Sequence, residues 1–85
     1  MRFLGKESFS APPTNEVLEL IPAEQAKIKE LAAQGVVEAA YAAADGSAMW
    51  IVWNSESQAD VEEVHKTLPL HDYLQSDITI LTDEA

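Results

Sequence analysis

The stretch from Ala48 to Trp53 is an unbroken apolar run that directly follows the turn pair Asp45-Gly46. Successive side chains of a strand point to opposite faces of its sheet, so this run predicts a strand that is apolar on both faces. An antiparallel sheet usually keeps one face in water. Because the helices of so short a chain can cover one face only, we expect the other face to meet a second copy of the protein.

Three further strands are expected on either side of this run, over residues 2–9, 36–43 and 76–82. The Asp-Gly pair at 45–46 is typical of a tight hairpin turn and should join the second strand to the third. The first strand precedes the turn residues Ala11-Pro12-Pro13, since proline cannot donate a hydrogen bond within a central strand.

A first helix is predicted between the first two strands. Apolar residues recur there at helical spacing, at Val17, Ile21, Ile28, Leu31 and Ala32. Pro22 interrupts the pattern, so either a short helix ends at Leu20 and a new one begins with Pro22 in its first position, or one helix kinks there. Gly35 is suited to end the helix because glycine readily adopts the left-handed conformation.

A second helix is expected after Ser57, which forms a capping-box-like pair with Asp60 three residues later. Its narrow apolar stripe consists of Val61, Val64 and Leu68. The helix should end at Leu68-Pro69-Leu70. His65 borders the stripe, and we expect it to face solvent.

This order of elements predicts one domain over residues 1–85 with a ferredoxin-like βαββαβ fold, in the α+β class. A four-stranded antiparallel sheet would carry two helices on one face. Two such sheets packed face to face would form a dimeric α/β barrel. A chain of this length buries only about 60–65% of its unfolded surface when alone, so dimerisation would add needed burial.

Composition narrows the possible partners. Fifteen acidic residues against five basic ones give a net charge of -10 and a pI near 4.3. Such a charge repels phosphate backbones and anionic lipids, so we expect neither nucleic acid nor a membrane as partner. The chain has no cysteine and no apolar run as long as a signal peptide or membrane span. We therefore expect a cytoplasmic protein.

Glu24 is the one candidate acid or base that the helical pattern singles out. It falls near the middle of the first helix's apolar stripe, where partial burial would raise the pKa of its carboxyl group. The alternative is an ordinary acid of the first helical turn, which the helix dipole favours and which bends out to water.

Four aromatic residues are candidates for contact with a flat organic ligand: Tyr41, Trp50, Trp53 and Tyr73. They are equally what a small core or a dimer interface uses. Trp50 and Trp53 lie on opposite faces of their strand, so both cannot line one simple cavity.

Metal and nucleotide chemistry find little support. His65 and His71 are only two histidines in a chain without cysteine, whereas a metal site needs three or four converging ligands. We expect no metal. No phosphate-binding, hydrolase or zinc-protease motif is present.

These residues carry a family resemblance. From Glu24 through Gly35, across the Tyr41 strand and on to Leu81, the chain resembles the muconolactone delta-isomerase family. The most specific piece is Leu68-Pro69-Leu70 followed by Tyr73. The resemblance implies the dimeric barrel, a pocket for small organic compounds between sheet and helices, and chemistry without a cofactor. It also implies that Glu24 moves a proton next to a carbonyl group, and it provides no counterpart for His65 or His71.

Two functions therefore remain open. The first is a cofactor-free isomerase-like or lyase-like enzyme that transfers a proton on a small carbonyl or lactone compound, with Glu24 as the catalytic group and Tyr41, Trp50 and Tyr73 holding the substrate. The second is a non-catalytic, oligomeric module of the same fold that binds small molecules or regulates. Haem chemistry is disfavoured, because neither histidine is clearly on a pocket wall.

Overall fold

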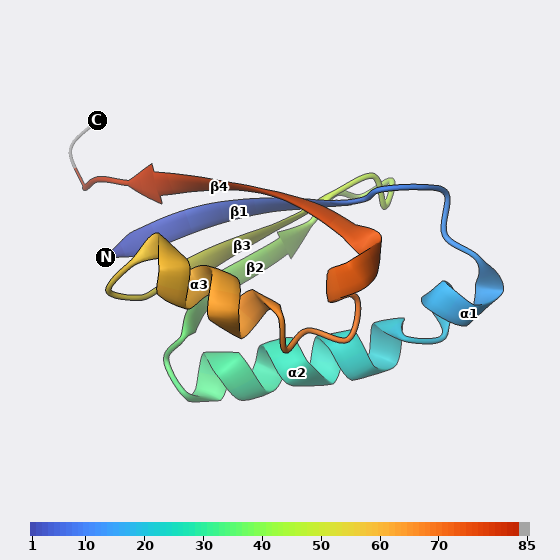
Figure 1. Ribbon diagram of the computed structural model, residues 1–85, viewed down its shortest axis with the longest axis horizontal. Coiled ribbons are helices and arrows are strands. Elements are labelled where there is room, and N and C mark those ends of the chain that lie inside the picture. The colour runs from blue at the N-terminus through green and yellow to red at the C-terminus, as the bar shows by residue number, and fades with distance from the viewer. Residues whose placement is uncertain (84–85) are drawn as a thin grey trace.

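The computed structural model describes residues 1–83 and has the predicted order of elements. They are β1 (Arg2–Phe9), α1 (Asn15–Leu18), α2 (Ile21–Ala33), β2 (Val37–Ala42), β3 (Met49–Asn54), α3 (Gln58–His65), the 3₁₀ turn η1 (His71–Tyr73) and β4 (Leu74–Leu81). The four strands form one antiparallel sheet in the order β2-β3-β1-β4. Both α2 and α3 lie under the same face of this sheet (Figure 1). The predicted ferredoxin-like fold is confirmed.

The first helical region divides at the proline into a short helix and a new one, which was one of the two predicted alternatives, the other being a single kinked helix. α1 is a single turn whose start is capped by Thr14, since its Oγ1 accepts a hydrogen bond from the Val17 N–H at 3.3 Å. α2 then begins at Ile21 with Pro22 in its first turn, where proline costs no hydrogen bond. It ends before Gly35, whose φ of 77° is the left-handed conformation expected there.

The hairpin between β2 and β3 closes as its turn residues predict. Gly46 has a φ of 76°, and the Asp45 carboxylate accepts a hydrogen bond from the Ser47 N–H at 2.9 Å. The Ala43 N–H donates to the Ala48 carbonyl at 2.9 Å. This turn forms one wall of the cavity described below.

Burial alternates along β1 and defines the helix-facing side of the sheet. Phe3, Gly5 and Glu7 are buried beneath the helices, while the residues between them are not. β1 is paired on both edges, so Gly5 lies between Ile51 of β3 and Ile78 of β4. The alternation therefore places Glu7, a carboxylate, on the inner side of the central strand.

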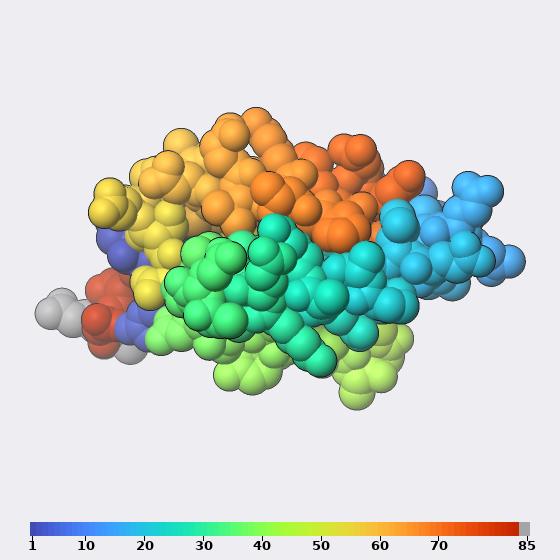
Figure 2. Space-filling view, turned by 90° about the horizontal axis from the view of Figure 1, so that it is seen from below, coloured from blue at the N-terminus to red at the C-terminus, as the bar shows by residue number. Residues whose placement is uncertain are grey.

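The hydrophobic core fills the space between this side of the sheet and the two helices. Its buried members are Phe3, Leu31, Val37, Ile51, Trp53, Val61 and Leu68. Ile51 and Trp53 are fully buried in the neighbouring strand. Seen from the helix side, α2 and the segment from α3 to η1 lie next to each other over the core (Figure 2). No helix of residues 1–83 is long and apolar enough to cross a membrane.

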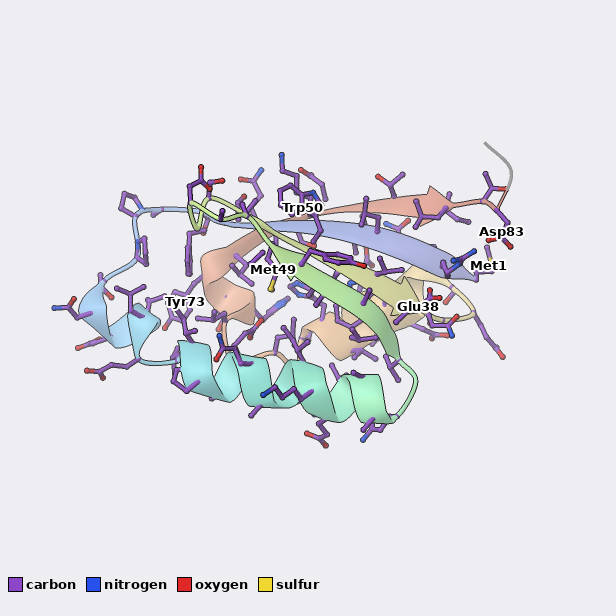
Figure 3. All side chains as sticks on the ribbon, turned by 180° about the vertical axis from the view of Figure 1, so that it is seen from behind. Met1, Glu38, Met49, Trp50, Tyr73 and Asp83 are labelled. Carbon is purple, nitrogen blue, oxygen red and sulfur yellow. The ribbon has the colours of Figure 1, made fainter. Side chains whose placement is uncertain are left out.

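The opposite face of the sheet has no helix over it among the described residues. It carries the partly or largely exposed side chains of Leu4, Tyr41, Trp50, Val52 and Leu81. Met49 lies on the helix side in Figure 3, and Trp50, the next residue of β3, points to this open face. The split between Trp50 and Trp53 is confirmed.

The second long helix is shorter than predicted. α3 begins after Ser57, whose Oγ accepts from the Asp60 N–H at 3.2 Å, but it ends at His65. Leu68 lies beyond that end and is buried in the turn that leads to Leu70. The helix stops early because the chain turns back toward the sheet, and this turn brings residues 65 and 71 together.

Candidate active site

A small cavity lies between the sheet, α2 and the hairpin turn. It has a volume of about 190 Å³ and is lined by Glu7, Ser8, Phe9, Ile21, Glu24, Gln25, Ile28, Ala42, Gly46, Ser47, Ala48, Met49, Leu70 and Leu74. Since a dry protein cavity of about 150 Å³ binds benzene, this space suits a single small ring. Most of its lining is apolar, and its charged residues are Glu7 and Glu24.

Glu24 lies in the first turn of α2, yet its side chain is only 3% exposed. Its Oε1 accepts a hydrogen bond from the Leu70 N–H at 3.0 Å. Its Oε2 is buried and has no hydrogen-bond partner among residues 1–83. The carboxyl group therefore turns inward, and the alternative in which it bends out to water is wrong.

Burial raises the pKa of the Glu24 carboxyl group above its ordinary value, and this is the largest influence on it. The hydrogen bond from the Leu70 N–H lowers this pKa, and the charge of nearby His65 lowers it by less, because both favour the charged form of the carboxyl group. The Glu7 carboxylate is a smaller influence that raises the pKa further. The net effect is a raised pKa for Glu24, which is a feature of many acid–base groups.

Glu7 is the second buried carboxyl group, 1% exposed on the central strand. Its Oε1 lies 2.9 Å from His65 Nε2 and accepts a hydrogen bond from the Ser76 hydroxyl at 3.0 Å. Its Oε2 is buried and has no hydrogen-bond partner in the described part of the chain. Gly5 leaves room for this arrangement, because a Cβ there would lie 3.3 Å from Glu7 Oε1 and 3.0 Å from Trp53 Nε1.

His65 is buried, at 4% exposure, so the expectation that it faces solvent is wrong. It is the last residue of α3, and the following turn returns His71 to it, with the two Nδ1 atoms 2.8 Å apart. Sequence reasoning missed the chain Glu7–His65–His71. The available signal was the alternation along β1, which puts Glu7 on the same face as Phe3.

The three aromatic residues expected to hold a substrate lie outside this cavity. Tyr41 is 64% exposed on the open face, where it is paired in register with Trp50. Tyr73 is 44% exposed and lines a different hollow, formed with residues 9–20. The structure brings none of them to Glu24, and their role as ligand contacts stays a prediction.

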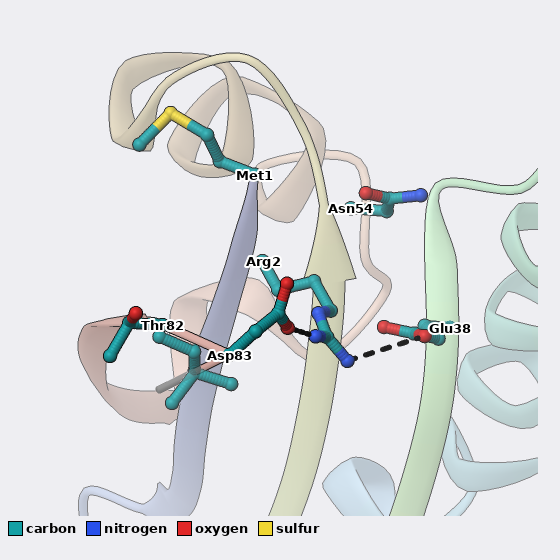
Figure 4. A pocket seen from close by; sticks show the side chains of 7 residues that line it. Met1, Arg2, Glu38, Asn54, Thr82 and Asp83 are labelled. Carbon is teal, nitrogen blue, oxygen red and sulfur yellow. Dashed lines mark ion pairs between the residues drawn. The ribbon is translucent and has the colours of Figure 1, made fainter. Parts of the chain in front are cut away.

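A larger hollow, of about 490 Å³, lies at the other end of the molecule around Arg2 (Figure 4). The Arg2 guanidinium pairs there with Asp83 and, at 3.7 Å, with Glu38. These charges satisfy one another. Within residues 1–83 no group of three or more histidine and acidic side chains is arranged to hold a metal ion. We therefore place the candidate active site at the cavity of Glu7 and Glu24.

Fold and site together define a ferredoxin-like α+β protein with buried carboxyl groups on a small cavity between sheet and helices. The sequence model of the muconolactone delta-isomerase family matches residues 1–84, and the chain belongs to that family. The family predicted from the sequence is thus confirmed.

Two solved structures share the fold. Muconolactone isomerase is 19% identical, with a TM-score of 0.82 over 100% of this chain and 94% of that one. The 5-chloro-2-hydroxyhydroquinone dehydrochlorinase of Burkholderia phenoliruptrix AC1100, solved with 2,5-dihydroxybenzoquinone, is 12% identical, with a TM-score of 0.78 over 96% and 94%. No curated protein sequence gives a significant match.

The buried Glu24 carboxyl group predicts how stability changes with pH. Because its pKa is raised in the folded state, the stability that it contributes is present below its ordinary pKa and is lost as pH rises through the folded value. Glu24→Gln cannot ionise, so the variant lacks this decrease in stability with rising pH. The difference in free energy of unfolding, variant minus wild type, should therefore increase between about pH 4 and about pH 7, as measured by urea denaturation.

Glu19→Gln is the matched control, since it removes the same charge from an exposed residue just before α2. It should show a smaller dependence. A difference for Glu24→Gln that stays constant or falls over this range would contradict the buried position of Glu24.

Proposed function

We propose that this protein is a cofactor-free enzyme that transfers a proton next to the carbonyl group of a small, uncharged lactone or related ring. The observation that carries the proposal is Glu24, a buried carboxyl group on a ring-sized cavity with one oxygen free of protein partners. Membership in the muconolactone delta-isomerase family supports the class of small-molecule-converting enzyme.

The proposed step is a proton shift within one substrate molecule. Ionised Glu24 takes a proton from the carbon next to the carbonyl, and the electron pair of that C–H bond moves into a conjugated enolate. The same carboxyl group then returns the proton two carbons further on, so that only a double bond has moved. A carboxyl group with a raised pKa suits both halves, because it is a stronger base than an exposed glutamate and still donates its proton readily.

The hydrogen bond from Leu70 fixes which oxygen performs this transfer. Its N–H occupies Glu24 Oε1, so Oε2 is the oxygen left for substrate. Because a backbone N–H donates to a fixed position, the carboxyl group is held in one orientation before substrate arrives. Holding a reacting group in place in this way removes an entropic part of the barrier.

The charges of the cavity support an uncharged substrate. Its lining includes two glutamates and no lysine or arginine. A ligand carboxylate would be desolvated there beside Glu7 and Glu24, which costs free energy without a compensating ion pair. Muconolactone carries a carboxylate, so we infer that this protein takes a neutral ring instead.

The proposal predicts the conversion of α-angelica lactone, a neutral unsaturated five-membered lactone, to its conjugated isomer. Proton NMR in D₂O would follow both the isomer and any deuterium taken up at the carbon to which the proton is returned. Muconolactone should react more slowly under the same conditions. Glu24→Gln should lower the rate about 10²–10⁴-fold, the usual contribution of a general acid–base group.

Glu19→Gln again serves as the control and should retain wild-type turnover. Full activity in Glu24→Gln would refute the assigned role. Binding of both lactones without conversion by the wild-type protein would refute the enzymatic proposal and favour the non-catalytic binding module.

We further propose that the open face of the sheet packs against a second copy of this chain. Tyr41 and Leu81 are exposed on it, and Trp50 and Val52 are only half-buried. Arg2, Lys6 and Asp77 share this face in the strand register, but its apolar part, on a chain that buries only a modest fraction of its surface alone, is what a face-to-face dimer would cover.

Native mass spectrometry should therefore detect a dimer or a larger assembly. Val52→Asp, at the middle of the face, should shift it to monomer, because a carboxylate would be buried at the interface. Ala59→Asp adds the same charge in the exposed first turn of α3 and should leave the assembly intact. A wild-type monomer at micromolar concentration, or a Val52→Asp variant that stays assembled, would contradict the proposal.

A further inference from the structure

Glu7, His65 and His71 form a continuous hydrogen-bonded chain that begins at the wall of the Glu24 cavity. Glu7 lines that cavity, and His65 lies 2.9 Å from Glu7 Oε1 on one side and 2.8 Å from His71 on the other. Both histidines line a second hollow, of about 360 Å³, on the outer side of α3 and β4. His71 is partly exposed. These hydrogen bonds thus connect the Glu24 cavity to a second hollow at the surface.

The distance between the two imidazole rings allows one proton between them. Each Nδ1 either bears a hydrogen or offers a lone pair, so a hydrogen bond at 2.8 Å requires one of each. Either His71 donates to His65, or His65 donates to His71. In the second case His65 Nε2 either accepts from a protonated Glu7 or itself bears a hydrogen, and then the charged ring is paired with the Glu7 carboxylate. With Glu7 protonated and both rings neutral, a shift of one proton along each hydrogen bond, with release from His71 Nε2, converts the second case into the first.

We propose that Glu7, His65 and His71 act as a proton relay between the cavity and solvent, a role that rests on the proposed proton-transfer function. A proton on Glu7 passes to His65 Nε2, the proton on His65 Nδ1 passes to His71 Nδ1, and His71 releases one from Nε2 to water. One proton enters and one leaves, and no electron changes hands. Run in reverse, the same steps protonate Glu7.

The surroundings of His65 suit such a relay. Glu7 from β1 and Glu24 from α2 are the acidic groups that act on it from the cavity side, and His71 faces it from η1. On the outer side the hollow is also lined by Glu62 of α3 and by Lys66, the residue after α3, both exposed. The remaining neighbours are uncharged: the Ser76 hydroxyl from β4 and the Trp53 ring from β3.

The free oxygen of Glu7 distinguishes this arrangement from one that only holds the fold together. Ser76 and His65 both act on Oε1, which leaves the buried Oε2 without a partner. An unsatisfied buried carboxylate oxygen costs free energy, so a structural role alone would favour a group with both oxygens paired. Glu7 lines the cavity, and the relay requires this oxygen to exchange a proton there with a bound molecule or with water.

The first test needs no substrate, because His65 and His71 are the only histidines in the sequence. Nitrogen-15 NMR of protein labelled at histidine resolves the ring nitrogens, and His71→Gln assigns them. A relay predicts a coupling between the two Nδ1 nuclei across the hydrogen bond. It also predicts that the two rings titrate together, with the position of the shared proton changing in Glu7→Gln.

Glu56→Gln, an exposed residue ahead of α3, is the matched control and should leave these signals unchanged. The relay would be overturned if the two rings titrate independently and if the tautomer of each ring is the same in Glu7→Gln as in the wild type.

The second test uses turnover of α-angelica lactone. Glu24 must be ionised to begin the proton shift, and its raised pKa favours retention of a proton, which the relay would carry from the cavity to solvent. His71→Gln should therefore lower kcat with little change in KM, and added imidazole should restore part of the loss by replacing the missing proton carrier. A loss that imidazole does not restore would overturn the relay while leaving Glu24 as the catalytic group. A different result would refute the proposed function alone: the two histidines titrate together, but Glu24→Gln turns over the lactone as fast as the wild type.

Discussion

Removing a carboxyl group from water without a full counter-charge disfavours its ionised form, and this constraint shapes the interior of the protein. Two glutamates are buried between the sheet and its helices, on the wall of one small cavity. They differ in their partners. Glu24 has a single backbone N–H, whereas Glu7 has a histidine and a hydroxyl group. The fold thus contains two carboxyl groups in different environments on the wall of one cavity.

The elements that hold these groups are the ones that also make the fold. β1 is paired on both edges, so Glu7 is held by the most constrained strand of the sheet. Glu24 is held at the start of α2, where the helix begins beside its proline and where the helix dipole partly offsets the cost of a negative charge. The turn after α3 supplies both the Leu70 N–H and His71. The cavity therefore depends on the same packing that stabilises the domain.

Local chemistry made much of this predictable from the sequence. Some features depend on only a few neighbouring residues: the positive φ values at Gly35 and Gly46, the proline at the start of α2 and the apolar run of β3. The inward position of Glu24 follows from helical periodicity. The Glu7–His65–His71 chain was not predicted, because 58 residues separate its first two members and their meeting depends on where α3 ends. The helix was expected to continue to Leu68, which left His65 on its outer side.

The most direct test of this account is a carbon-13 NMR titration of the glutamate side-chain carboxyl groups, with the Glu24 signal assigned from its absence in Glu24→Gln. The account predicts that Glu24 takes up its proton at a pH above the ordinary value of 4.5, because burial is the largest influence on it. A midpoint at or below 4.5 would show that the carboxyl group is solvated or paired in solution. It would remove the physical basis for Glu24 as the acid–base group of the cavity.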